Sequence, residues 1–256
     1  MAERPEHHPD TKVGGVAEKF LYVGLDRDRR RQNVDLANRL AAAETGDGFG
    51  FKVNLDHALM WGESYVKEIV AAGRDVFVDL KMNNGPRTMG NIMNWLGELG
   101  VSLTNAWAHS EANLAGTLSA IERSDNVPRV FGVTFYTRWD EAYARKHHGM
   151  SLPALIGHWS RVAVENGADG IILPANHLEA VGDLETPKLC PGIRMLGDAG
   201  AGEQRQVGSP YDAALRGADI LVVGSPIHSA ARPAEALRTY LDEIGRAAAE
   251  LQAGEA

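Results

Sequence analysis

The sequence predicts an α/β fold, and three observations specify a (β/α)8 barrel. Short apolar runs alternate with amphipathic stretches from Lys19 onwards, eight of these runs have the length of a strand, and most of them end in polar residues. Eight strand–helix units in a chain of 256 residues match the TIM barrel. The rival is an open doubly wound sheet, which the lack of a Gly-x-Gly-x-x-Gly motif after the first strand disfavours.

The predicted strands are apolar runs rich in Val, Ile, Leu and Phe that stop at polar or turn-forming residues. Nearly continuous apolar runs are typical of parallel strands that are covered on both faces. In chain order the strands are Phe20–Asp26, Phe49–Asn54, Val76–Lys81, Leu103–His109, Val130–Tyr136, Gly170–Pro174, Leu189–Ile193 and Ile220–Gly224.

The predicted helices lie between these strands and carry apolar residues at helical spacing. Most stop at a glycine, which readily adopts the backbone conformation of a helix end. The ranges are Val34–Ala43, His57–Ala72, Met89–Leu99, Leu114–Arg123, Leu152–Asn166 and Tyr211–Arg216, with glycines at Gly73, Gly100, Gly167 and Gly217. His147 and His148, beside Arg145 and Lys146, are expected in a solvated loop before the helix at Leu152.

One domain is expected over residues 19–250, because no linker or low-complexity segment breaks the alternation before an Ala/Glu-rich end near residue 247. Residues 1–18 are polar and contain no apolar segment of the signal-peptide kind, so we expect them to form a disordered N-terminal tail.

Composition restricts the partners and the location of the protein. The formal net charge is −8, which gives no overall basic field for nucleic acid. No apolar stretch approaches the roughly 20 residues that a membrane helix needs. Cys190 is the only cysteine, which excludes an intrachain disulfide and a Cys-x-x-Cys metal site and fits a reducing cytosol. We therefore expect a cytoplasmic protein with no nucleic acid or membrane partner, and no other cluster of metal ligands is apparent in the sequence.

In a barrel, functional residues collect at the carboxyl ends of the strands. The polar residues predicted there are Asp26, Lys52 with Asn54, Asp79 with Lys81, His109, Thr134 with Thr137, Asn176, Arg194 and Gly224-Ser225. Asp79 and Lys81 are two apart on one strand, so they face the same side. With Lys52 from the neighbouring strand they are expected to converge as an array of alternating charge, which is costly to desolvate. The alternative for Asp79 and Lys81 is a structural ion pair.

After residue 18 the chain resembles the orotidine 5′-monophosphate decarboxylase family over nearly its whole length. The motifs that carry the resemblance are Gly24-Leu25-Asp26, Phe51-Lys52-Val53, Asp79-Leu80-Lys81 followed by Pro86 and Thr88, Val133-Thr134 with Thr137, Pro191-Gly192-Ile193-Arg194, Gly202-Glu203-Gln204-Arg205 and Val222-Val223-Gly224. Lys52 discriminates further, because related sugar-phosphate enzymes of the same superfamily typically carry an acidic metal ligand there.

The resemblance implies a decarboxylation without any cofactor, which makes uridine 5′-monophosphate in pyrimidine biosynthesis. It implies that Lys81 protonates the C6 carbanion, that Asp79 crowds the departing carboxylate and that Lys52 orders Asp79 and the ribose. It further implies that Asp26 binds ribose hydroxyls and that Thr88 and Thr137 line the nucleotide pocket. Gln204 and backbone amides near Gly224 are implied to bind the phosphate. The family is typically a homodimer in which the loop after Lys81 completes the partner's site.

The chain departs from the family pattern at two positions. The last residue of the motif Asp-x-Lys-x-x-Asp is Asn84, which cannot carry the charge of the second carboxylate, and the segment Asn84-Gly85-Pro86 predicts a looser loop. At the eighth strand, Gly-Arg of the family reads Gly224-Ser225, so the arginine of the phosphate clamp is missing. Arg194, Arg205 or the basic run Arg27–Arg31 can compensate, although such a run is also typical of a solvated helix start.

Four functions fit these observations. The first is orotidine 5′-monophosphate decarboxylase, and the second is a diverged relative that acts on another carboxylated heterocycle, nucleoside or nucleotide in specialised metabolism. A non-catalytic ligand-binding barrel and a metal-dependent aldolase or decarboxylase are weaker, because both lysines of the array are retained. His109 either contacts substrate or caps a layer of the barrel interior.

Overall fold

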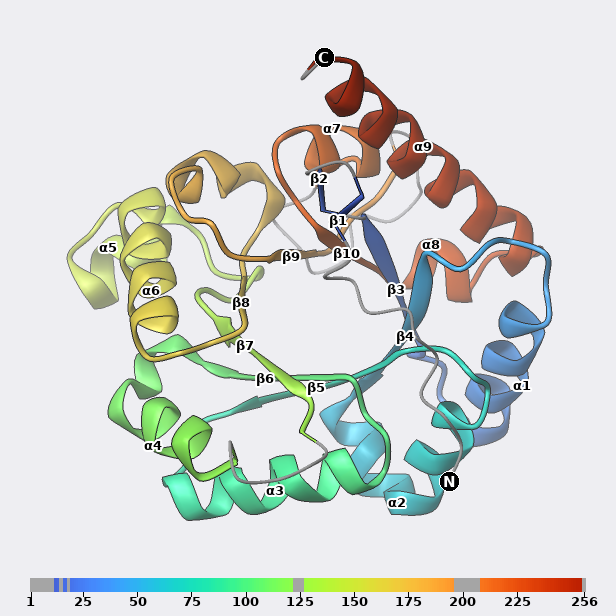
Figure 1. The fold of residues 1–256 in the computed structure, drawn as a ribbon, viewed down its shortest axis with the longest axis horizontal. Helices are drawn as coiled ribbons and strands as arrows, with labels where there is room; N and C mark the ends of the chain where they lie inside the picture. Colours follow the sequence, from blue (N-terminus) through green and yellow to red (C-terminus); the bar gives the residue numbers. More distant parts are fainter. Residues whose placement is uncertain (1–11, 14–15, 18, 122–126, 196–207, 255–256) are drawn as a thin grey trace.

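Eight parallel strands form a closed barrel, and helices surround it in a computed structural model that describes residues 12–13, 16–17, 19–121, 127–195 and 208–254 (Figure 1). Neighbouring strands follow the order β10-β3-β4-β5-β6-β7-β8-β9. They are β3 (Phe20–Gly24), β4 (Phe49–Asn54), β5 (Val76–Met82), β6 (Leu103–Trp107), β7 (Arg129–Val133), β8 (Gly170–Ile172), β9 (Lys188–Pro191) and β10 (Ile220–Val223). The predicted (β/α)8 barrel is therefore confirmed, with all eight strands in the predicted order.

The helices that cover the barrel include all six that were predicted. They are α1 (Arg30–Ala41), α2 (Leu55–Val70), α3 (Pro86–Glu98), α4 (Ala112–Ile121), α5 (Glu141–His148), α6 (Leu152–Glu165), α7 (Pro210–Leu215), α8 (Ser225–His228) and α9 (Pro233–Gly254), with the short 3-10 segments η1 (Ala108–Ser110) and η2 (Ala175–Val181). None of the helices in the described ranges is both long and apolar enough to cross a membrane.

Two segments differ from the expectation. The loop predicted at His147 and His148 is wrong, because these residues form the last turn of α5. Asp140 caps the start of that helix by accepting a hydrogen bond from the backbone of Tyr143 at 3.0 Å, and Gly149 ends it with φ +68°. The Ala/Glu-rich end belongs to the long helix α9, on which Ala247 is fully buried.

Lys12–Val13 (β1) and Val16–Ala17 (β2) pair as a two-stranded antiparallel sheet within the range expected to be a tail. The rest of residues 1–18 lies outside the described residues. The proposed domain boundary at residue 19 is close to the first barrel residue, Phe20.

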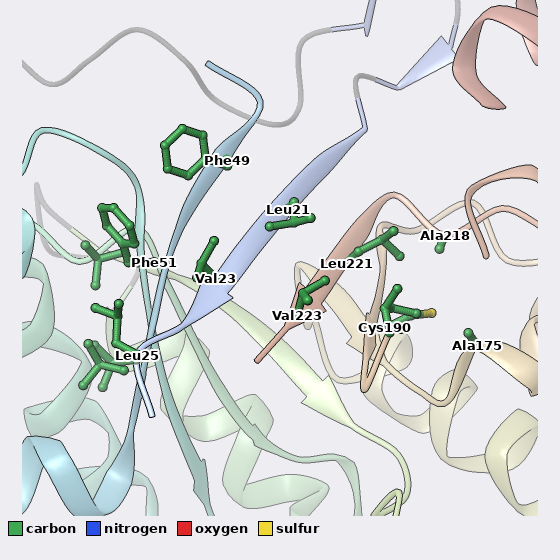
Figure 2. Close-up of a cluster of buried hydrophobic side chains, with 14 of the residues drawn as sticks. Leu21, Val23, Leu25, Phe49, Phe51, Ala175, Cys190, Ala218, Leu221 and Val223 are labelled. Atoms are coloured by element: carbon green, nitrogen blue, oxygen red, sulfur yellow. The ribbon is translucent and has the colours of Figure 1, made fainter. Parts of the chain in front are cut away.

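Alternation along the strands separates two apolar layers. The larger cluster packs the strands against the helices, and Figure 2 shows Leu21 and Val23 of β3 with Leu221 and Val223 of β10 in it. A second cluster consists of strand residues alone and fills the barrel interior. Its members are Phe20, Tyr22, Phe77, Leu103, Phe131, Val133, Ile172, Leu189, Ile220 and Val222.

The same alternation places charged residues above this second cluster, toward the carboxyl ends of the strands. On β5, Val76 and Val78 belong to the outer cluster while Phe77 belongs to the inner one, so Asp79 follows Phe77 on the interior side. On β4, Phe51 and Val53 pack outward, which directs Lys52 to the interior. The barrel therefore brings these polar side chains together at the carboxyl end of its strands.

Candidate active site

A cavity of ≈ 330 Å³ opens at the carboxyl ends of the strands. Its floor is apolar and includes Phe77, Leu189 and Val222 of the cluster that fills the barrel interior. Its polar side, from β3 to β6, consists of Asp26, Lys52, Asn54, Asp79, Lys81 and Asn105. The opposite side and rim include Phe135, Tyr136, Thr137, Arg138, Arg194, Gly224, Ser225 and His228. The cavity can thus hold a ligand with one apolar ring face and several polar or anionic groups.

Lys52, Asp79 and Lys81 converge in this cavity as the strand-end argument predicts. The Lys81 Nζ donates to Asp79 Oδ1 at 2.6 Å. The Lys52 Nζ lies 3.6 Å from Asp79 Oδ2 and 3.8 Å from Asp26 Oδ1. Asp79 therefore has one ammonium on each carboxylate oxygen, and Lys52 lies between two carboxylates.

Asn54 extends the array to the first strand. It accepts a hydrogen bond from Lys52 and donates through Nδ2 to Asp26 Oδ1 at 2.7 Å. Because β4 places Lys52 and Asn54 two residues apart on the interior side, one strand supplies both contacts. The Asp26 carboxylate is thereby held at the edge of the cavity with its Oδ2 oxygen near Gly24 and Gly224, where an added Cβ would lie 2.8 Å and 3.4 Å from it.

Burial alone would raise the pKa of Asp79, but the two lysine ammonium groups, with hydrogen bonds from Lys81 and Asn105, outweigh it and hold this pKa below its usual range. The Asp79 side chain is 12% exposed. At neutral pH the site therefore contains a buried carboxylate that is already ionised beside two cations.

This depressed pKa predicts a pH-dependent contribution to stability. A carboxyl with a lowered pKa stabilises the folded state above the unfolded value of about 3.9 and loses that contribution as the pH falls through the folded value. From about pH 5 down to about pH 2 the free energy of unfolding should therefore fall more steeply for the wild type than for Asp79→Asn. Urea unfolding across this range measures it, and equal slopes would contradict the assignment.

The predicted substrate-binding residues, together with Asn84 of the predicted catalytic set, separate into three groups. Asp26, Thr137, Arg194, Gly224 and Ser225 line the cavity. Asn84 and Thr88 do not line it as formed by the described part of this chain; Asn84 is exposed, and its Oδ1 accepts from the Gly85 backbone at 2.8 Å. Gln204 lies outside the described residues, as does Arg205.

His109 and the basic run are placed away from the cavity lining. The His109 Nε2 lies 3.2 Å from Asn83 Nδ2, and its ring packs at 5.1 Å from that of Trp107. Burial lowers the pKa of His109, and nearby His148 adds to this effect. Arg27 donates to the carbonyl oxygen of His228, with its Nε at 2.8 Å, so its guanidinium is used within the fold.

Asn105 and His228 are among the cavity residues that were not identified from the sequence. Asn105 lies inside a predicted strand, where its only sequence signal is an amide in a largely apolar run. His228 follows Gly224-Ser225 by one helical turn and lines the cavity from α8. Burial lowers the pKa of His228, Asp26 opposes this effect, and the cations Arg27 and Lys52 reinforce it.

Comparison with known proteins agrees with this geometry. The model of the Orotidine 5′-phosphate decarboxylase / HUMPS family matches residues 19–240. The chain belongs to this family. It is a carboxy-lyase of the orotidine 5′-phosphate decarboxylase superfamily.

Curated members of the family are similar over most of their length. The chain is 31% identical to the orotidine 5′-phosphate decarboxylase of Paramagnetospirillum magneticum over 238 residues, which cover 88% of this chain and 98% of the relative. It is also 31% identical to the enzyme of that name from Streptococcus pneumoniae over 209 residues, or 80% of this chain and 88% of the relative.

Solved structures share the fold. Orotidine 5′-phosphate decarboxylase from Lactobacillus acidophilus superposes with a TM-score of 0.71 at 23% identity, over 89% of this chain and 99% of that one. Orotidine 5′-monophosphate decarboxylase from Methanocaldococcus jannaschii, complexed with the inhibitor BMP, superposes with a TM-score of 0.68 at 19% identity, over 89% and 98% of the two chains.

Proposed function

We propose that the protein decarboxylates orotidine 5′-monophosphate to uridine 5′-monophosphate in the cytoplasm, without a cofactor. The observation that carries the proposal is the Asp79–Lys81 pair, joined at 2.6 Å above an apolar floor and flanked by Lys52. The bond between C6 and the carboxylate breaks, its electron pair stays on C6, and carbon dioxide leaves. The proton on Lys81 Nζ then moves to C6.

The charge arrangement favours the transition state over the bound substrate. The Asp79 carboxylate repels the substrate carboxylate before reaction, and this repulsion disappears as carbon dioxide forms. The Lys81 ammonium lies beside the position where negative charge develops, so it stabilises the carbanion and supplies its proton. Lys52, which contacts both Asp79 and Asp26, fixes the orientation of these carboxylates.

The nucleotide is expected to extend across the cavity from this array. Asp26 accepts from ribose hydroxyls, and Thr137 lines the part of the cavity that takes the base. Among the compensating cations considered, Arg27 is bonded to the His228 carbonyl, whereas the guanidinium of Arg194 has no hydrogen bond or ion pair with any described residue. We assign the phosphate contact to Arg194, in place of the arginine missing at Ser225.

Arg194→Ala is expected to weaken binding of uridine 5′-monophosphate by about 10- to 100-fold, because a hydrogen bond to a charged group contributes about 1.5–3 kcal/mol. Binding of uridine, which has no phosphate, should change little. Arg161→Ala is the matched control, since Arg161 is exposed and pairs with Asp183 outside the cavity. Isothermal titration of the three proteins measures this difference, and an equal loss for both ligands would exclude a phosphate contact.

A homodimer is proposed because Asn84 and Thr88 lie outside the cavity of their own chain. The first turns of α2 directly follow the cavity residue Asn54 and expose an apolar patch, with Leu59 74% and Met60 63% exposed. Such a patch beside the cavity mouth suits the face of a second copy, whose loop would then contribute Asn84 and Thr88.

Leu59→Glu is expected to convert the dimer to monomers and to reduce turnover, because a charge would be buried in the subunit contact. Sedimentation velocity at micromolar concentration measures the first effect. Val164→Glu is the control, since Val164 is also apolar and exposed, at 36%, but lies on α6. A wild-type protein that is monomeric and fully active would contradict the proposal.

The second candidate function is decarboxylation of a different heterocycle, nucleoside or nucleotide. It is favoured by Asn84 and Ser225, because both altered positions concern the charge of the substrate. The deciding experiment follows the absorbance of orotidine 5′-monophosphate with purified protein, with and without EDTA. EDTA-resistant turnover supports the first function, whereas neither turnover nor binding of uridine 5′-monophosphate points to the second.

A further inference from the structure

The backbone of Lys81 adopts an uncommon conformation. Its φ is +48°, in the left-handed region that residues other than Gly, Asn and Asp seldom occupy. The register between β5 and β6 is irregular in the same segment, between Val78 and Met82. This conformation costs of order 1 kcal/mol or more and persists only where surrounding contacts enforce it.

Asn105 supplies a contact that enforces it. This residue lies on β6, is 1% exposed, and accepts the backbone N–H of Lys81 on its Oδ1 at 2.6 Å. The irregular register removes this segment from the regular strand ladder, so the side-chain amide stands in for a strand partner. Without it, the Lys81 N–H would lose a partner in a largely buried place.

The other end of the same amide holds the catalytic carboxylate. Asn105 Nδ2 donates to Asp79 Oδ1 at 2.8 Å, and this is the oxygen that receives the Lys81 ammonium. One buried side chain thus fixes both the backbone of the lysine and the carboxylate that pairs with it. The amide can do this because its oxygen is an acceptor and its NH2 group is a donor.

We propose that Asn105 is a positioning residue, which sets the relative placement of the Lys81 ammonium and the Asp79 carboxylate for decarboxylation. The proposal rests on the proposed function for its catalytic consequence. It assigns no contact between Asn105 and the reacting atoms, although the residue lines the cavity. Its two hydrogen bonds explain why an amide occupies the middle of a buried strand.

Asn105→Ala removes both hydrogen bonds and is expected to lower kcat about 100-fold while KM changes much less, because misplacement of reacting groups affects the transition state. Thr104→Val is the matched control. The Thr104 hydroxyl is buried and donates to the Val78 carbonyl at 2.9 Å, so this variant loses one β5–β6 hydrogen bond without touching Asp79 or Lys81. We expect its kcat to stay within about threefold of the wild type.

Asn105→Asp separates positioning from a structural role. It is nearly isosteric and still accepts from Lys81, but it places a second carboxyl beside Asp79. The pair must then take up a proton at a higher pH than Asp79 alone, so the acid limb of the pH–kcat profile should move upward. The same titration is measured without substrate by carboxyl-carbon NMR of free wild-type protein and free variant.

The outcomes separate this proposal from the proposed function. No turnover of orotidine 5′-monophosphate by the wild type would reject that substrate, while the NMR titration would still decide whether Asn105 acts on Asp79. Turnover with an unmoved acid limb in Asn105→Asp, or equal losses of kcat in Asn105→Ala and Thr104→Val, would overturn the positioning role. Thermal unfolding of each variant verifies that the protein compared is folded.

Discussion

Replacement of Lys81 by alanine is expected to lower kcat by about 10⁴-fold or more. The variant loses a general acid, which contributes about 10²–10⁴-fold, and a cation beside the developing carbanion, an effect of about 10²–10³-fold for comparable groups. Binding of product should be retained, because Asp26 and Arg194 lie elsewhere in the cavity. Single-turnover assays combined with a titration of uridine 5′-monophosphate measure both quantities.

The control for Lys81→Ala is Lys67→Ala. Lys67 lies on the outer helix α2, is 58% exposed and pairs with Glu63, so its loss should leave turnover unchanged. Removal of Lys81 also leaves Asp79 with one ammonium fewer, so the substrate carboxylate should bind less favourably beside Asp79 in this variant. Turnover at the wild-type rate in Lys81→Ala would exclude Lys81 as the proton donor.

The double variant Asn84→Asp with Ser225→Arg is expected to increase kcat/KM for orotidine 5′-monophosphate by at least about 10-fold. Ser225 is exposed at the start of α8 and lines the cavity, so an arginine has room there. A charge-assisted bidentate contact with phosphate contributes about 1.5–3 kcal/mol more than no contact. Steady-state kinetics with orotidine 5′-monophosphate measures the gain.

The two single variants act through different routes. Ser225→Arg should improve phosphate binding in its own chain, whereas Asn84→Asp should act in the partner's site of the proposed dimer. Binding of uridine, which has no phosphate, is the internal control, since Ser225→Arg should leave it unchanged. If the double variant shows no gain, the cavity has diverged from the family at more than these two positions, and the second candidate function gains support.

The sequence predicted the barrel well because its pattern is local and periodic. Each strand is an apolar run whose alternate residues face the interior and the helices, and this pattern is visible without any contact being known. The same periodicity predicted that Asp79 and Lys81 face one side at the end of β5, because they are two residues apart in the sequence. The helix α5 was missed because its sequence is mostly polar and shows no apolar face. Its helix signals are only the N-cap Asp140 and the terminating Gly149.

By itself the sequence determined the fold class, the end of the barrel that carries the candidate site, and the charged residues Lys52, Asp79 and Lys81 as candidates there. Only the tertiary structure decided how these charges pair, which oxygen of Asp79 meets which lysine, and that Asn105 holds both members of the pair. The physical reason is that strand periodicity is a property of neighbouring residues. The φ of Lys81 and its contact with Asn105 depend instead on an irregular register between β5 and β6. These strands are neighbours in the barrel, but the helix α3 lies between them in the sequence.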